Sequence, residues 1–279
     1  MKYRLAYIFI LLCCVAFSCR DDEPESNGNG VTKKTYDVAG VKFNMVLVEG
    51  DTFLMGADSI MDKDYWDDEV PVHQVVLSDY YIGELEVTQN LWKKVMGTIP
   101  SDNFKGGNKS DNYPVEKVSW LDCQKFIQKL NEMTKANFDM PTEAQWEFAA
   151  RGGKKSKSFK YSGGDGIKMV GWFNENSENE THITGKKKPN ELGIYDMSGN
   201  VREWCSDWYA AYEDSLQIDP EGPDRPINRD SVRVARGGSF SDSLYYCRNT
   251  FRQKSLPSSK LKYVGLRLVL PIEVGTQQK

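Results

Sequence analysis

The chain has 279 residues and a formal net charge of −4, from 36 Lys and Arg against 40 Asp and Glu. Without an excess of basic residues there is no electrostatic footprint for DNA or RNA, so we expect no nucleic acid among its partners. After residue 34 no linker-like change of composition divides the chain. Its length suits one large domain.

The first 19 residues have the pattern of a lipoprotein signal peptide. Lys2 and Arg4 precede an apolar run at residues 5–17, which is too short to span a bilayer but suits a signal-peptide core. The run ends in Ala-Phe-Ser before Cys19, which resembles a lipobox, so we expect Cys19 to be lipidated. The anchor would lie in the outer membrane of the bacterial cell envelope, facing the periplasm or the outside. Ordinary secretion with cleavage near Ser18 is the alternative.

Residues 20–34 are polar and rich in Asp, Glu, Asn and Gly. Such a segment cannot bury enough apolar surface to fold, so we expect a flexible acidic tether. The folded domain is expected at residues 35–273, followed by a disordered tail at residues 274–279.

The first predicted strands lie at residues 46–56 and 75–87. In residues 46–56, VLVEGDTFLMG, apolar residues alternate around an Asp-Thr turn, which predicts a β-hairpin. Residues 75–87 are rich in β-branched and aromatic side chains and predict further strand.

Two helices follow. Thr88 can cap a helix over residues 89–96 that ends at Gly97, and Ser119 can cap one over residues 120–134. The apolar residues of the second helix form one stripe that faces a core: Trp120, Cys123, Phe126, Ile127, Leu130 and Met133.

A third helix is predicted from PTEAQWEFAARGG. Thr142 and Gln145 have the spacing of a capping box, and Gly152 is placed to end the helix. Strand-like segments return near residues 231–240 and 263–270. Helices early in the chain and short strands late in it predict an α+β fold.

Several segments in this order resemble the formylglycine-generating (sulfatase-modifying factor) family. They are VEGDTFLMG, VTQNLWKKVMG, YPVEKVSWLDCQKF, MPTEAQWEFAARGG, NELGIYDMSGNVREWCSDWY, RVARGGSF and VGLRL. Together they extend over about residues 46–270. The resemblance implies a single α+β domain with a complex C-type-lectin-like fold, little regular secondary structure and long loops.

The resemblance supplies only half of a copper site. In the oxidase members of the family, two cysteines five positions apart after a Gly-Gly-Ser turn bind Cu(I), a soft cation that prefers thiolates. Cys247 matches the second position, but Asp242 stands at the first. A carboxylate is a hard ligand, so we expect no copper. Cys247 remains the one candidate for a catalytic thiol.

The resemblance also implies a structural disulfide between Cys205 and Cys247. Cys205 lies in REWCSDWY, and many non-oxidase relatives have a cysteine there together with one like Cys247. In an exported protein the bond would close a loop of about forty residues and stabilise the fold by about 3–4 kcal/mol. A free inert Cys247 and a reactive or metal-bound Cys247 are the alternatives.

The segment YDMSGNVREW predicts a metal site. Asp196 and Glu203 flank a glycine-containing turn, and hard oxygen ligands in such a loop suit Ca²⁺. In the family this segment binds calcium, and by position the ligands are the side chains of Asp196 and Glu203 and the carbonyls of Gly199 and Val201. One structural calcium is implied. A metal-free turn held by Asn200 is the alternative.

Other catalytic arrangements lack a signature. His73 and His182 are the only histidines, and they lack metal-ligand spacing. Ser239 lies in the Gly-Gly-Ser turn without a nucleophile elbow.

The expected function is that of an exported, lipid-anchored, non-oxidase binding or assembly module of the cell envelope, with an envelope protein or glycan as partner. Long loops on such a scaffold commonly carry recognition. The aromatic residues expected to line a groove are Trp66, Tyr80, Tyr81, Tyr209 and Tyr212. The alternative is a formylglycine-generating-type oxidase with an altered metal site.

Overall fold

The structure is a computed structural model that describes residues 25–26, 31–57, 63–103, 105–106, 111–226 and 231–272. Its α-helices are α1 (Gln89–Met96), α2 (Trp120–Thr134), α3 (Glu143–Ala150) and α4 (Ile167–Val170), and short 3-10 helices lie at Asp67–Glu69, Gly153–Lys155 and Leu244–Cys247. Its strands are β1 (Glu25–Ser26), β2 (Thr32–Val38), β3 (Val41–Val48), β4 (Thr52–Met55), β5 (His73–Val76), β6 (Tyr80–Gly83), β7 (Arg202–Trp208), β8 (Gln217–Ile218), β9 (Arg233–Arg236), β10 (Arg252–Ser255), β11 (Val264–Gly265) and β12 (Val269–Pro271).

The three helices predicted from capping residues are all present. The side chain of Thr88 accepts a hydrogen bond from the Leu91 amide at the start of α1, and Gly97 ends that helix in the left-handed conformation. Capping boxes open α2 at Ser119 and α3 at Thr142. Local hydrogen bonding therefore sets where these helices begin.

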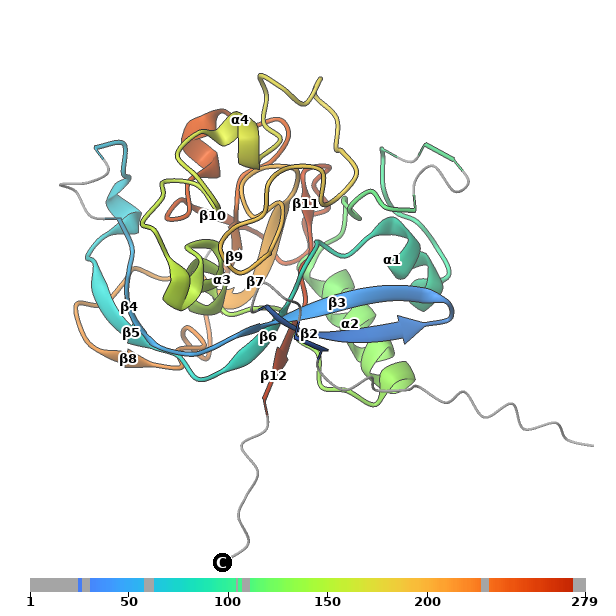
Figure 1. Cartoon of the computed structure of the whole chain (residues 1–279), viewed down its shortest axis with the longest axis horizontal. Coiled ribbons are helices and arrows are strands. Elements are labelled where there is room, and N and C mark those ends of the chain that lie inside the picture. Colours follow the sequence, from blue (N-terminus) through green and yellow to red (C-terminus); the bar gives the residue numbers. More distant parts are fainter. Residues whose placement is uncertain are drawn as a thin grey trace, which may run out of the picture.

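Within the described residues the strands form three sheets, ordered β1-β2-β3-β6-β12, β10-β9-β7-β11 and β4-β5-β8. Figure 1 shows α1 and α2 beside β2 and β3, and a loop-rich part around α4 at the top of the molecule. Trp92 of α1 stacks on Phe126 of α2 with ring centroids 4.7 Å apart, inside the core that these elements share. The predicted α+β class with long loops is confirmed.

The predicted hairpin at residues 46–56 is wrong. β3 pairs with β2 and β6, whereas β4 pairs with β5 in another sheet. The chain changes sheet at Gly50, where a Cβ atom would lie 2.0 Å from the carbonyl oxygen of Leu77. Because this close packing fixes the connection, the alternating pattern belongs to two strands that bend apart.

α3 is buried although it carries two glutamates. The guanidinium of Arg236 on β9 donates to Glu143 at 2.8 Å and to Glu147 at 2.5 Å, and Arg252 on β10 donates to both oxygens of Glu143 at 2.7 and 2.8 Å. All four side chains are buried. Because each charge has an opposite partner, these pairs fix α3 against the β10-β9-β7-β11 sheet.

The ordered domain begins earlier than predicted. β2 starts at Thr32, before the expected boundary at residue 35, and β1 pairs with it, so part of the predicted tether belongs to the sheet. The signal peptide at residues 1–19, the lipidation site Cys19 and the tail at residues 274–279 lie outside the described residues. No helix in the described part of the chain is long and apolar enough to cross a membrane.

Candidate functional site

Asp242 is held by an arginine and a serine. Arg202, the first residue of β7, donates from Nε to Oδ2 of Asp242 at 2.9 Å and from Nη2 to Oδ1 at 2.6 Å. Ser239 Oγ also donates to Oδ2, at 2.7 Å. The Arg202 guanidinium also lies over the Tyr263 ring, with Cζ 4.6 Å from the ring centroid. A bidentate ion pair therefore fills the position of the first copper ligand.

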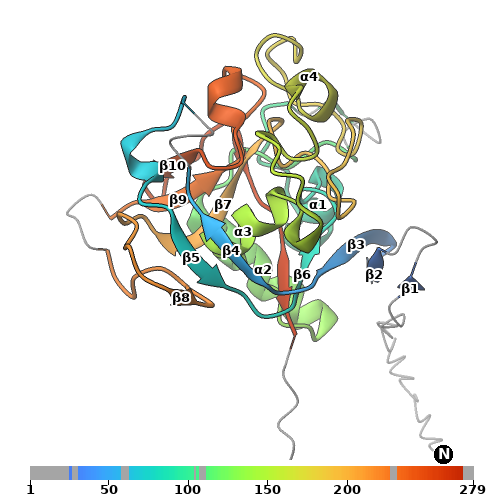
Figure 2. The same cartoon turned by 60° about the vertical axis from the view of Figure 1, so that its left-hand side comes forward.

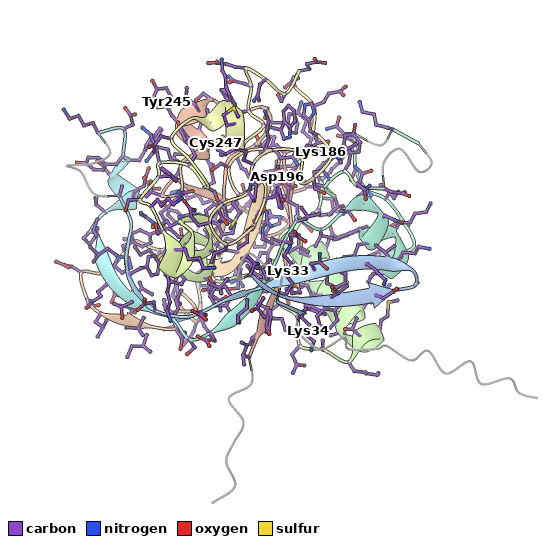
Figure 3. All side chains as sticks on the ribbon, in the orientation of Figure 1. Lys33, Lys34, Lys186, Asp196, Tyr245 and Cys247 are labelled. Carbon is purple, nitrogen blue, oxygen red and sulfur yellow. The ribbon has the colours of Figure 1, made fainter. Side chains whose placement is uncertain are left out.

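Cys247 is a buried, neutral thiol. Its side chain has no exposed surface and belongs to a hydrophobic cluster with Tyr161 and Phe173. Figure 3 labels Cys247 in the upper, loop-rich part of the molecule. Burial, and next the charge of Asp242, raises the pKa of the Cys247 thiol far above its usual range. The thiolate is the nucleophile and the metal ligand, so this environment opposes both roles.

The predicted disulfide between Cys205 and Cys247 is absent, and this expectation is corrected. Cys123, Cys205 and Cys247 are all free and buried. Cys205 lies on β7 in the hydrophobic cluster around α3, whereas Cys247 belongs to a different cluster near α4. Each thiol behaves as a small apolar side chain of its own core cluster.

The predicted calcium segment forms a tight turn. Asp196, Gly199 and Asn200 all have positive φ angles, and a Cβ atom on Gly199 would lie 2.1 Å from the carbonyl oxygen of Trp172. The Gly199 amide donates to the Gly237 carbonyl at 2.7 Å. Only glycine fits this position without displacing backbone.

The two predicted carboxylate ligands have different partners. Both oxygens of Glu203 accept hydrogen bonds from Arg267, at 2.7–3.0 Å, and Oε2 also accepts one from Trp146 Nε1 at 2.6 Å. Asp196 Oδ2 accepts from the Gly185 amide at 2.6 Å, while Oδ1 is buried with no partner. Burial raises the pKa of Asp196 to about 6.

Glu86 belongs to the same cluster, and the sequence analysis did not identify it. Its oxygens accept hydrogen bonds from Asn200 Nδ2 at 2.9 Å and from the Val201 amide at 3.2 Å. Burial first, and then the charges of Asp196 and Glu203, raises its pKa well above the usual range. The one available signal was a glutamate set between the apolar residues Leu85 and Val87.

The charges and the unpaired oxygen of this cluster fit a divalent cation. Three buried carboxylates, Glu86, Asp196 and Glu203, face one guanidinium, that of Arg267. Within the described residues, no three Asp, Glu, His or Cys side chains converge to hold a metal by themselves. A calcium here would therefore need the carbonyls of Gly199 and Val201, the ligands that the family resemblance implies.

Few of the aromatic residues expected in a groove are exposed. Tyr80 and Tyr209 are buried, Tyr81 and Tyr212 are half-buried, and Trp66 is 52% exposed. Trp66 packs against the rings of Tyr246 and Phe251, with centroids 6.2 and 5.8 Å away. Of the five predicted residues only Trp66 is therefore exposed, and the sequence pattern could not distinguish it from tyrosines of the core.

The two histidines do not form a common site. His182 stacks on Trp172 at 3.7 Å between centroids and donates from Nε2 to the Ser177 carbonyl at 2.8 Å. His73 lies on β5, against Tyr212. Among the described residues, the hydroxyl of Ser239 forms side-chain hydrogen bonds with Asp242 and Ser241 and with neither histidine.

A family model described as the sulfatase-modifying factor enzyme 1-like domain matches residues 36–272. The chaperone protein LppX of Paenibacillus barcinonensis is 34% identical over 82% of this chain and 90% of that protein. The formylglycine-generating enzyme of Streptomyces coelicolor is 33% identical over 56% of this chain and 52% of the enzyme, so the match spans about half of the enzyme.

A solved structure has the same fold. Treponema denticola variable protein 1 superposes with a TM-score of 0.77 at 33% identity, and the match covers 85% of this chain and 98% of that one. The predicted formylglycine-generating-enzyme-like α+β fold, with its C-type-lectin-like architecture, is confirmed. The chain belongs to the sulfatase-modifying factor enzyme 1-like family.

Proposed function

We propose that this protein is a binding or assembly module of the bacterial cell envelope, exported and lipid-anchored, and not a cysteine oxidase. The observation that carries the proposal is the ion pair between Arg202 and Asp242 beside a buried Cys247. Cu(I) binding in the oxidase manner needs two thiolates. Here one of the two positions holds a carboxylate already committed to a guanidinium.

The relatives favour a protein as the partner. The similarity to LppX, which is named a chaperone, extends over most of both chains. Trp66 and Tyr245 are exposed aromatic side chains, at 52% and 49% exposure, of the kind that anchors protein contacts. A loop-borne aromatic surface on a rigid core suits recognition.

The lipid anchor is proposed from the lipobox-like sequence before Cys19. A Cys19→Ser variant of the full chain is expected to leave the membrane fraction, because a protein without its acyl anchor loses most of its membrane affinity. The measurement is detergent phase partitioning of both chains. Equal partitioning would remove the anchor from the proposal.

The proposed calcium is structural. When bound between Asp196 and the carbonyls of Gly199 and Val201, it would supply positive charge to a cluster with excess buried carboxylate. Arg267 already neutralises Glu203, so this chain holds the turn in place whether or not a cation is present.

The test of the non-oxidase proposal is a Cu(I) titration of the reduced full chain in competition with a chromogenic chelator. We expect Cys247→Ser to change nothing, because Cys247 has no partner thiolate. An Asp242→Cys variant, which supplies the missing thiolate, is expected to take more Cu(I) from the chelator than the wild type. If the wild type instead binds one Cu(I) and loses it on Cys247→Ser, the chain is an oxidase-like copper protein.

A further inference from the structure

A cavity of about 270 Å³ lies away from the Asp242 and Asp196 sites. It is lined by residues of β4, β5, α3, β8 and β10, by the end of β7, and by loop residues 210–213 and 220–223. Figures 1 and 2 both show β4, β5 and β8 together on one side of the molecule. The volume is just below the range of about 300–1,000 Å³ typical of drug-sized ligands, so it suits a small group.

Asp207 forms part of the wall as a buried carboxylate without an ion pair. Its Oδ2 accepts hydrogen bonds from the Glu143 amide at 2.8 Å and from Ser206 Oγ at 3.2 Å, both neutral donors. Burial, and next the charge of Glu143, raises the pKa of Asp207 to about 7. Gly222 covers it so closely that a Cβ atom there would lie 2.9 Å from the Asp207 Cβ.

His73 supplies a second acceptor in the wall of the cavity. The side chain is only 6% exposed and lines the cavity, with its ring 4.7 Å from that of Tyr212. Its Nδ1 lies 3.0 Å from the Pro71 carbonyl and donates to it, so in the neutral ring the lone pair is on Nε2. Within the described residues Nε2 has no hydrogen-bond partner, and it is not fully buried, so a donor group in the cavity can reach it.

The charge of the cavity is negative. Its lining includes Glu143, Asp207, Glu213 and Glu221 against one cation, Arg252. Arg252 is committed to both oxygens of Glu143 and to the Asp68 carbonyl. Glu143 is therefore neutralised, and the other three carboxylates have no ion-pair partner in the described structure.

We infer that this cavity binds the ammonium group of a small primary amine or of a lysine side chain. An ammonium carries three donors and no acceptor, which matches Asp207 and His73 Nε2 together with the charge of the rim. The remaining walls, formed by Met55, Ala144, Trp208 and Ala211, are apolar and accommodate a methylene chain. This inference does not depend on the proposed function.

The experiment is a calorimetric titration of the full chain in detergent at pH 8, with n-butylamine as the first probe. We expect saturable binding of butylamine and none of butyrate, which has similar length and the opposite charge. Asp207→Asn is expected to weaken butylamine binding at least tenfold, because the substitution keeps an acceptor for the Glu143 amide but removes the charge. Glu116→Gln is the matched control, since Glu116 is also a buried carboxylate whose pKa burial raises to about 7 but lies outside this cavity. Its affinity is expected to stay within twofold of wild type.

A capped Gly-Gly-Lys-Gly-Gly peptide separates the two sources of the ammonium group. Binding of the peptide as tight as that of butylamine assigns the cavity to a lysine side chain of another polypeptide, and binding of butylamine alone assigns it to a free amine. If Asp207→Asn does not fold, His73→Phe is titrated with butylamine instead. This variant keeps a ring against Tyr212 but removes the lone pair, so it is expected to bind butylamine more weakly than the wild type. The inference fails if neither probe saturates the wild-type chain. It fails equally if the folded variants bind butylamine as the wild type does.

Discussion

Asp242 shows how a single carboxylate changes what a site can do. Its two oxygens take both donors of the Arg202 fork and the hydroxyl of Ser239. An aspartate in a thiolate position would otherwise be a partly buried charge without compensation, which is costly. Arg202 compensates the charge of the Asp242 carboxylate. Because the carboxylate is a hard ligand that is already paired, this position does not bind a soft metal ion.

The first prediction concerns this pair. Asp242→Ala is expected to lower the free energy of unfolding by about 2–3 kcal/mol, because it leaves the mostly buried Arg202 guanidinium without its partner. Glu175→Ala, which breaks the exposed pair between Lys168 and Glu175, is expected to cost less than about 1 kcal/mol. Urea denaturation of the three chains measures both values. Equal losses would show that Asp242 contributes no more than a surface charge.

The second prediction concerns the pH dependence that Asp207 introduces. Its folded-state pKa of about 7 lies above its ordinary value of 3.8. Between these values the native state holds a proton that the unfolded state releases, so stability falls as the pH rises from about 4 to 7 and then levels off. The cost at pH 8 has an upper limit of about 4 kcal/mol.

The measurement compares Asp207→Asn with the wild type at pH 4, 6 and 8. We expect the variant to gain stability relative to wild type as the pH rises, because the amide cannot ionise. Glu143 and Arg233, whose charges act on Asp207 or respond to it, are the same in both chains, as is the separately titrating Glu116. A difference that is constant with pH would show that Asp207 titrates normally.

At the scale of elements, backbone turns position the candidate metal segment more than side chains do. Gly97 and Gly199 both have positive φ angles, of 77° and 92°. A Cβ atom on Gly97 would meet nothing within 4 Å, whereas one on Gly199 would lie 2.1 Å from the Trp172 carbonyl oxygen. A substitution at Gly97 therefore tests the cost of the left-handed backbone alone, whereas one at Gly199 adds the cost of the close contact with Trp172.

The third prediction uses this matched pair. Gly97→Ala is expected to cost about 1–2 kcal/mol from the left-handed conformation alone. Gly199→Ala is expected to cost about 1–3 kcal/mol more, because the backbone at Trp172 must also move. Chemical denaturation gives both numbers. If the two variants lose the same stability, the approach of Trp172 to Gly199 does not constrain the turn.

The helices could be predicted from sequence because their signals are local. Thr88, Ser119 and Thr142 each bond an amide within three residues along the chain. The hairpin at residues 46–56 was predicted wrongly because strand partners are chosen by the whole fold, and β4 finds its partner in β5. Met133 belongs to the apolar stripe predicted for α2 but is exposed, so the apolar pattern did not predict which end of the stripe leaves the core.

The candidate site was predicted in part for the same reason. Asp242 was seen to depart from the family pattern, but its pairing with Arg202 joins residues 40 positions apart. Glu86 meets Asn200 across 114 positions. Residues so far apart share no helix or strand pattern, so their contacts could not be predicted from the sequence and become visible only in the folded structure.

At the scale of the whole molecule, the carboxylate cluster joins distant segments around one turn. Glu86 follows β6, Asp196 and Asn200 lie before β7, and Arg267 precedes β12. A cation bound here would therefore act on the stability of the whole domain.

The fourth prediction follows from that arrangement. Removing calcium with EGTA is expected to lower the melting temperature of the full chain by about 5–10 °C, if calcium is first present at about 100 times its dissociation constant. Asp196→Asn is expected to abolish the difference, because it removes a ligand charge. Asp219→Asn, whose carboxylate instead bonds Ser78, should retain it. An Asp196→Asn chain that still responds to EGTA would place the calcium elsewhere.

The order of strands in the largest sheet has a consequence for synthesis. β12 closes the edge of β6 by pairing Val269 with Ile82, although nearly the whole domain separates them in sequence. The ribosome makes β6 long before β12, so the β6 edge of the sheet has no partner strand until the chain has been made as far as residue 271. A chain that stops before β12 therefore presents an open sheet edge that proteases and chaperones can recognise.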